Sequence, residues 1–315
     1  MLSRIAADVE RAVARRLERG QRGGTARTTL ARGDGWVVED VICTSGPDDP
    51  SFEEHHAGVS IAVVVAGTFQ YRAGIAPELL TPGSLLLGND GRCYECGHQH
   101  ATGDRCVAFR FAPAYFERIA FDASEPGGSY AFRVGRLPPL RELSWVSARA
   151  AIGLLGAADT AWDEFTVELA VTVLRLANGA PGRASLIPRG AESRVTASVR
   201  SIERDPMAPR TLQELAREAR LSTFHYLRTF TRVTGVTPHQ FILRTRLREA
   251  AARLATKRDK VAEVALGVGF DDLSNFNHSF RVAFGMSPRE FRRLYSENAG
   301  PRQRSTASWV GNDAR

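Results

Sequence analysis

The residues best suited to chemistry in this sequence lie in one short segment, CYECGHQHATGDRC, residues 93–106. A C-x-x-C pair followed by H-x-H is a spacing typical of Zn²⁺ or another thiophilic ion. Strand alternation can, however, turn the first two cysteines to opposite faces. Three interpretations therefore stay open: a zinc or other transition-metal site, a thiol pair that senses oxidants or electrophiles, and side chains that only pack in a small core or turn. The candidate metal ligands are Cys93, Cys96, His98, His100 and Cys106.

Positive charge is concentrated in the last third of the chain. The 315 residues carry a net charge of +7, and residues 194–295 contain 19 Lys and Arg against 10 Asp and Glu. Local basicity of this kind favours a polyanionic partner such as nucleic acid. The sequence has no run of about 18 apolar residues that would predict a membrane span, and residues 1–20 lack the apolar core of a secretory signal. We therefore expect a cytoplasmic protein with no membrane partner.

The basic third also contains an internal repeat. The segment LSTFHYLRTFTRVTGVTPHQF (221–241) aligns with FDDLSNFNHSFRVAFGMSPREF (270–291). Thr211 and Glu214 form a capping box ahead of the first copy, and Ser222 can cap its second helix. In the second copy Asp271 or Asp272 can cap the corresponding helix. Each copy therefore predicts a helix-turn-helix unit.

The second helix of each unit is expected to be apolar on one face and polar on the other. At about 100° per residue, Phe276 and Phe280 share a core face, whereas the polar residues lie opposite or on the flanks. Short polar side chains suit base edges in a major groove, and two such units in a basic domain favour this interpretation over a merely solvated face. The predicted DNA-contacting residues are Phe224, Leu227, Arg228 and Thr231 in the first unit and Ser274, Asn275, Asn277, His278 and Arg281 in the second.

Residues 194–295 resemble the DNA-binding domain of the AraC/XylS family of bacterial transcription regulators. The motifs that carry the resemblance are LQELAREARLS (212–222), HYLRTF (225–230), GVTPHQFILRTRLREAAARL (235–254), VAEVALGVGF (261–270), SNFNHSF (274–280) and FGMSPREFR (284–292). The resemblance implies two helix-turn-helix units joined by a long helix, bound in successive major grooves of paired half-sites in double-stranded DNA. It also implies that Arg228 and the cluster Arg244, Arg246 and Arg248 hold bases or phosphates.

This sequence departs from the family at two predicted reading positions. His278 stands where the family often has arginine, and Leu227 offers no polar group. The first unit is therefore expected to bind more through thymine methyl groups and the DNA backbone than through hydrogen bonds to bases.

The family resemblance implies a sensing or dimerising domain ahead of the DNA-binding domain, often a cupin-like β-barrel. Residues 36–112 carry short β-rich runs separated by turns, which resemble such a barrel, although EEHHAG does not meet the usual cupin metal pattern. The fold class we expect is multidomain α and β. Its parts are a peripheral arm and linker (1–35), a cupin-like β-barrel domain (36–135), a helical pair for dimerisation (136–178), a linker (179–193), an all-α domain with two helix-turn-helix units (194–295) and a tail (296–315).

Together these features predict a sequence-specific DNA-binding transcription regulator, not an enzyme, whose N-terminal domain senses a small molecule, metal or redox signal. Double-stranded DNA, an unknown effector, a second copy of the chain and RNA polymerase are the expected partners, and activator and repressor are not distinguished. One alternative is a cysteine- or metal-dependent enzyme, or a DNA alkyl-repair protein fused to an AraC-like domain, although no nucleophile, base and orienting group occur at a recognisable spacing. Another is a dimerisation module with vestigial DNA binding.

Overall fold

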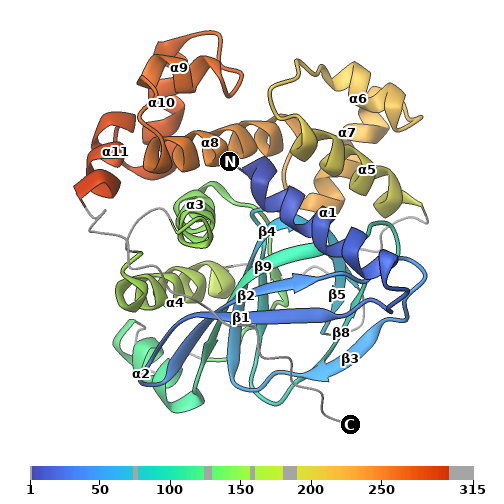
Figure 1. The fold of residues 1–315 in the computed structure, drawn as a ribbon, viewed down its shortest axis with the longest axis vertical. Coiled ribbons are helices and arrows are strands. Elements are labelled where there is room, and N and C mark those ends of the chain that lie inside the picture. The colour runs from blue at the N-terminus through green and yellow to red at the C-terminus, as the bar shows by residue number, and fades with distance from the viewer. Residues whose placement is uncertain (1, 74–76, 124–129, 157–159, 180–189, 298–315) are drawn as a thin grey trace.

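The structure is a computed structural model that describes residues 2–73, 77–123, 130–156, 160–179 and 190–297. A sheet-rich N-terminal domain lies below an all-helical C-terminal domain in the view of Figure 1, with further helices between them. The predicted linker falls largely on residues 180–189 and the predicted tail on 298–315, both outside the described residues. Within the described part of the chain, no helix has the length and apolarity that crossing a membrane requires.

The N-terminal domain is built from two antiparallel sheets. The larger has the order β1-β2-β9-β4-β7-β10 and the smaller the order β3-β8-β5-β6. Among the described residues no strand pairing joins the two sheets, so the predicted barrel is an open sandwich. The larger sheet comprises β1 (Thr25–Gly33), β2 (Trp36–Cys43), β4 (Val59–Gly67), β7 (Leu85–Gly88), β9 (Asp104–Phe111) and β10 (Arg136–Leu137), and the smaller comprises β3 (Phe52–His55), β5 (Phe69–Arg72), β6 (Glu78–Leu80) and β8 (Cys93–Gly97).

Strand β4 is apolar on both faces because it lies between two cores. Alternate residues point to opposite sides of a strand. Ala62 and Val64 face the smaller sheet, in a cluster with Tyr71 and Leu80. Ile61 and Val63 instead belong to the core that the larger sheet shares with the helices covering its other face. These covering helices are α1 (Leu2–Glu18), α2 (Pro113–Ala123), α3 (Ser144–Leu154) and α4 (Trp162–Gly179), with a short 3₁₀ turn, η1 (Arg141–Leu143).

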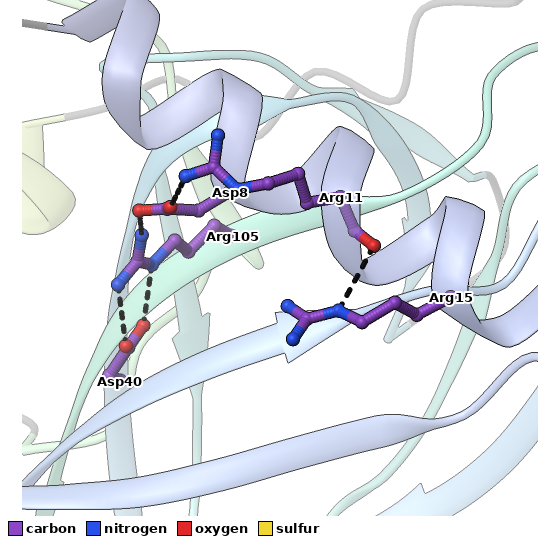
Figure 2. A network of polar contacts seen from close by, with 5 residues as sticks. All are labelled: Asp8, Arg11, Arg15, Asp40 and Arg105. Carbon is purple, nitrogen blue, oxygen red and sulfur yellow. Dashed lines mark hydrogen bonds and ion pairs between the residues drawn. The ribbon is translucent and has the colours of Figure 1, made fainter.

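The predicted N-terminal arm is part of this core, which corrects the expectation of a peripheral segment. Ile5 and Val9 of α1 are buried against the larger sheet. Figure 2 shows how Arg105 of β9 ties the helix to the sheet, with Nη1 2.9 Å from Asp8 Oδ2 and Nη2 2.7 Å from Asp40 Oδ2. The predicted linker after α1 also differs, because residues 25–33 form strand β1 along the whole of β2. Its polar composition suits an exposed edge strand.

The helical pair predicted for dimerisation packs its apolar faces within one chain. Phe165, Leu169 and Val173 of α4 are fully buried in the core beneath the larger sheet. On α3, Ala148 and Ile152 pack instead into the C-terminal domain. These faces are therefore not left open for a second subunit.

The C-terminal domain consists of helices, as predicted, and begins three residues earlier than expected, at Ala191. Capping residues hold the predicted turns: Thr211 and Glu214 form the capping box of α6, Ser222 Oγ accepts from His225 N, and Asp272 accepts from two backbone amides of α10. The elements are α5 (Ala191–Arg204), α6 (Leu212–Glu218), α7 (Thr223–Thr234), α8 (Pro238–Thr256), α9 (Val261–Leu266), α10 (Leu273–Phe284) and α11 (Pro288–Glu297). The α6–α7 and α9–α10 units lie at opposite ends of the long helix α8 (Figure 1).

Candidate DNA-binding interface and cysteine–histidine cluster

The outer face of α10 carries the polar residues predicted to contact DNA. Phe276 and Phe280 are fully buried and pack against each other, with ring centroids 5.6 Å apart. This packing turns the opposite face of the helix to solvent. The exposed residues on that face include Ser274, Asn275, Asn277, His278 and Arg281. The structure thus gathers the predicted set of the second unit on one accessible surface.

Helix α7 has a matching division of faces but a more apolar surface. Tyr226 and Phe230 are buried in the core of the first unit. Phe224 is exposed over 71% of its surface and Arg228 is exposed, while Leu227 and Thr231 are half-buried. An exposed phenylalanine beside an arginine suits contacts to thymine methyl groups and phosphates. Contact of either surface with DNA stays a prediction.

The arginines of α8 lie elsewhere than the resemblance implies. Arg244 donates to the carbonyl of Pro139, and Arg246 donates to the carbonyls of Pro206 and Gly269 at 2.8 and 2.7 Å. Burial lowers the pKa of both guanidinium groups. Their donors therefore hold turns and domains together in this structure. Sequence spacing could not show this, because a backbone carbonyl partner leaves no signature in residue type.

The third arginine of the α8 cluster is also internal. Arg248 is only 6% exposed and donates to Thr245 Oγ1 at 3.1 Å. Burial lowers its pKa to about 10, although the charge of Glu203 opposes this shift. Arg248 thus stands between α8 and α5 and not on the predicted DNA surface.

The N-terminal domain is docked directly on both helix-turn-helix units. At the first unit, Leu79 of β6 joins the core, and Arg136 donates to the carbonyls of Leu79 and Val233, each at 2.8 Å. At the second unit, Ala148 and Ile152 of α3 join the core around α8 and α10. The sequence motifs did not indicate these contacts.

The predicted metal ligands divide between the space between the two sheets and the protein surface. Cys96 and Cys106 are buried between the sheets, as is His98, whose side chain is 1% exposed. Cys93 and His100 are exposed, and Cys93 Sγ lies 3.1 Å from His55 Nε2 at the surface. The five predicted ligands therefore do not form one site.

Two residues outside the predicted set join the buried group. Cys43 and Asp104 each place a ligand atom within 4.8 Å of a ligand atom of His98. Burial opposes a charge on His98, but the hydrogen bond and charge of Asp104, with a contribution from Cys43, raise its pKa to about 10. Asp104 stands in the GDRC part of the segment but was not among the predicted ligands, and Cys43 lies on a distant strand.

Comparison with known proteins identifies the C-terminal part of the chain. Residues 215–294 match a family model described as a helix-turn-helix domain. The chain is 34% identical to the probable transcriptional regulator LumQ of Photobacterium leiognathi over an alignment of 82 residues. This alignment covers 26% of this chain and 33% of LumQ. It is 38% identical to the transcriptional activator RhaS of Pectobacterium carotovorum subsp. carotovorum over an alignment of 72 residues. This alignment covers 23% of this chain and 25% of RhaS. The chain thus spans a third or less of the length of these relatives.

A solved structure of unsaturated fatty acid-bound ToxT from Vibrio cholerae aligns with 86% of this chain and 99% of the ToxT chain, at 12% identity and a TM-score of 0.33. Residues 215–294 are a helix-turn-helix domain of the class found in bacterial transcription regulators. This confirms the predicted resemblance to the AraC/XylS family over the DNA-binding part of the chain. Nothing in these matches favours the enzyme alternative.

Proposed function

We propose that this protein is a sequence-specific DNA-binding transcription regulator whose N-terminal domain passes an effector signal to its two helix-turn-helix units. The observation that carries the proposal is the pair of outward faces on α7 and α10, in the domain that holds the chain's excess of positive charge. Two helix-turn-helix units at opposite ends of α8 suit paired major-groove sites on one duplex. A second copy of the chain and RNA polymerase are further expected partners, in the cytoplasm.

The docking contacts support regulation through the N-terminal domain. Arg136 donates to one carbonyl of each domain, and α3 packs on α8. A shift within the sheets can therefore change the position of the two helix-turn-helix units relative to each other. A ligand can bias such a change only by binding one arrangement more tightly than the other.

The proposal is tested by selecting a target duplex from a random-sequence DNA library and measuring affinity by fluorescence anisotropy. Asn275→Ala removes a polar side chain from the exposed face of α10, and we expect about a 10- to 100-fold loss of specific affinity. Arg228→Ala is expected to lower the slope of log affinity against log salt by about one, as for one lost phosphate contact.

Arg175→Ala is the matched control, because it removes one exposed arginine from α4, which belongs to neither helix-turn-helix unit. It should leave affinity for the selected duplex unchanged. If neither Arg228→Ala nor Asn275→Ala weakens specific binding, the assigned DNA-binding faces are wrong. An affinity that hardly depends on salt would instead favour a dimerisation module with vestigial DNA binding.

A further inference from the structure

A second candidate site lies between the two sheets of the N-terminal domain. Cys43, His98 and Asp104 offer one sulfur, one ring nitrogen and one carboxylate oxygen, all within 4.8 Å of one another. Cys43 ends β2 and faces Asp104 directly across the β2–β9 pairing, while His98 follows β8. Strand β2 and the short segment 98–104, which are far apart in the sequence, therefore bring their ligand atoms together, and all three residues are buried.

The polar groups of this site are incompletely satisfied by the protein. The Asp104 side chain is 6% exposed, and its Oδ1 lies 2.7 Å from His98 Nε2. Its Oδ2 accepts from the Cys106 thiol at 3.4 Å, and the salt bridges of the described residues give Asp104 no lysine or arginine partner. His98 Nδ1 is buried without a hydrogen-bond partner of good geometry. The His98–Asp104 contact satisfies one carboxylate oxygen and one ring nitrogen, so the buried His98 Nδ1 is the atom that still lacks a partner, which is costly.

We propose that Cys43, His98 and Asp104 bind a divalent transition-metal ion of the zinc class. Thiolate, imidazole and carboxylate are the three ligand types that zinc takes from proteins, whereas Mg²⁺ and Ca²⁺ prefer oxygen ligands alone. Ligands on a tetrahedral zinc ion lie about 3.3–3.8 Å apart, as zinc–ligand distances of about 2.0–2.3 Å require. Atoms already within 4.8 Å need only small side-chain movements to meet this geometry.

The site borders the apolar cluster that contains Phe69, Cys96 and Cys106. The Phe69 ring stacks near His98 at a centroid distance of 6.0 Å. Cys106 Sγ lies 3.4 Å from Asp104 Oδ2, so one further thiol adjoins the site. Coordination requires Cys43 as a thiolate and His98 with a ring nitrogen free of its proton, so metal binding releases these protons to solvent.

The site adjoins the contact between the two domains. Asp104 pairs across the sheet with Gly67 of β4. The Gly67 backbone amide in turn hydrogen-bonds the carboxylate of Glu203 on α5 of the DNA-binding domain. A shift of Asp104 on metal binding can therefore reach α5 through Gly67 alone. This regulatory consequence rests on the proposed function, whereas metal binding itself does not.

Elemental analysis of the full chain, purified under reducing conditions without chelator, tests the site directly. We expect about one zinc per chain in the wild type and loss of that zinc in Cys43→Ser and His98→Gln. Titration of chelator-treated protein with Co²⁺ should produce thiolate-to-cobalt absorption in the wild type that is absent in Cys43→Ser. Neither readout involves DNA, so a failure here is distinct from a failure of the proposed regulator function.

Cys93→Ser is the matched control, because it removes the exposed cysteine of the same segment and should retain the metal. Circular dichroism of each variant establishes that a lost metal does not reflect an unfolded domain. Wild-type protein that stays metal-free after zinc is added and excess is removed would overturn the proposal. Metal lost in Cys93→Ser but kept in Cys43→Ser would also overturn it, since the ion would then lie at the surface pair of Cys93 and His55.

Discussion

At the scale of single residues, the adjacent histidines His55 and His56 differ in how far their side chains are buried. His55 is exposed, whereas His56 is 7% exposed and its ring stacks on Tyr94 at 4.2 Å. Tyr71 donates its hydroxyl proton to the Leu87 carbonyl at 3.2 Å, so its oxygen is free to accept from His56 Nε2 at 2.9 Å. Burial lowers the pKa of His56 to about 4, although the charge of Glu54 opposes the shift. The imidazole is thus neutral in the folded domain.

This lowered pKa predicts acid sensitivity. Below about pH 6.5 the unfolded chain protonates His56 and the folded chain does not, so the contribution of this residue to stability is lost as the pH falls from 6.5 towards 4. We expect the stability difference between wild type and His56→Gln to shrink by about 2 kcal/mol between pH 7 and pH 4.5. Urea unfolding at both pH values measures it, with His55→Gln as control. A difference that stays constant with pH would contradict this account.

The ligand-rich segment illustrates what sequence could and could not predict of the site. The composition of residues 93–106 correctly marked a place where cysteines and histidines gather, and alternation predicted that Cys93 and Cys96 separate to opposite faces. In the structure Cys96 is buried and Cys93 is exposed. The partner Cys43 was not predictable, because only the β2–β9 register brings it to Asp104.

At the scale of elements, the turn before α10 depends on a glycine and an arginine from another helix. Gly269 has φ +88°, and its carbonyl accepts from Arg246 of α8 at 2.7 Å. A β-carbon at Gly269 would lie 3.0–3.2 Å from the Arg246 guanidinium group. The Arg246 guanidinium group thus occupies the space next to Gly269 that a β-carbon would need.

Gly269→Ala is therefore expected to destabilise the second unit by about 2–3 kcal/mol, from left-handed backbone strain and the displacement of Arg246. Gly285→Ala is the matched control, since Gly285 has φ +74° but a β-carbon there would meet no atom within 4 Å. It should cost only the backbone strain of about 1 kcal/mol. Thermal unfolding of both variants compares the two costs. Equal losses would show that Arg246 does not support the turn.

The elements of the DNA-binding domain were predictable because local signals dominate there. Capping residues and the 3.6-residue period of phenylalanines each act within a few residues, and the structure confirms them. Strand β1 was not predictable because its polar residues gain their pairing from β2 alone. Helix α1 was expected to be a peripheral arm because its buried face, with Ile5 and Val9, is too short a pattern to indicate which core it joins.

At the scale of the whole molecule, an ionisable pair, Glu203 and Arg248, lies where the two domains meet. Glu203 of α5 is partly buried, hydrogen-bonds the Gly67 amide and is attracted to Arg248 of α8. A cavity of about 230 Å³ adjoins it between α1, the sheet and α5. Desolvation raises the pKa of Glu203 to about 8, against the opposing effects of Arg248, Arg200 and the Gly67 hydrogen bond.

The raised pKa predicts that the domain contact weakens with rising pH. Between about pH 4.5 and 8 the folded chain retains a proton on Glu203 that the unfolded chain releases, so stability from this group falls as the pH rises through that window. Glu203→Gln imitates the protonated carboxyl, and its stability should fall less between pH 5.5 and 8.5 than that of the wild type, by on the order of 2 kcal/mol. Calorimetric unfolding at the two pH values measures the difference, and Glu218→Gln, at an exposed position on α6, is the control. If wild type and Glu203→Gln lose stability in parallel, Glu203 is ionised in the folded protein, and the domain contact does not depend on its proton.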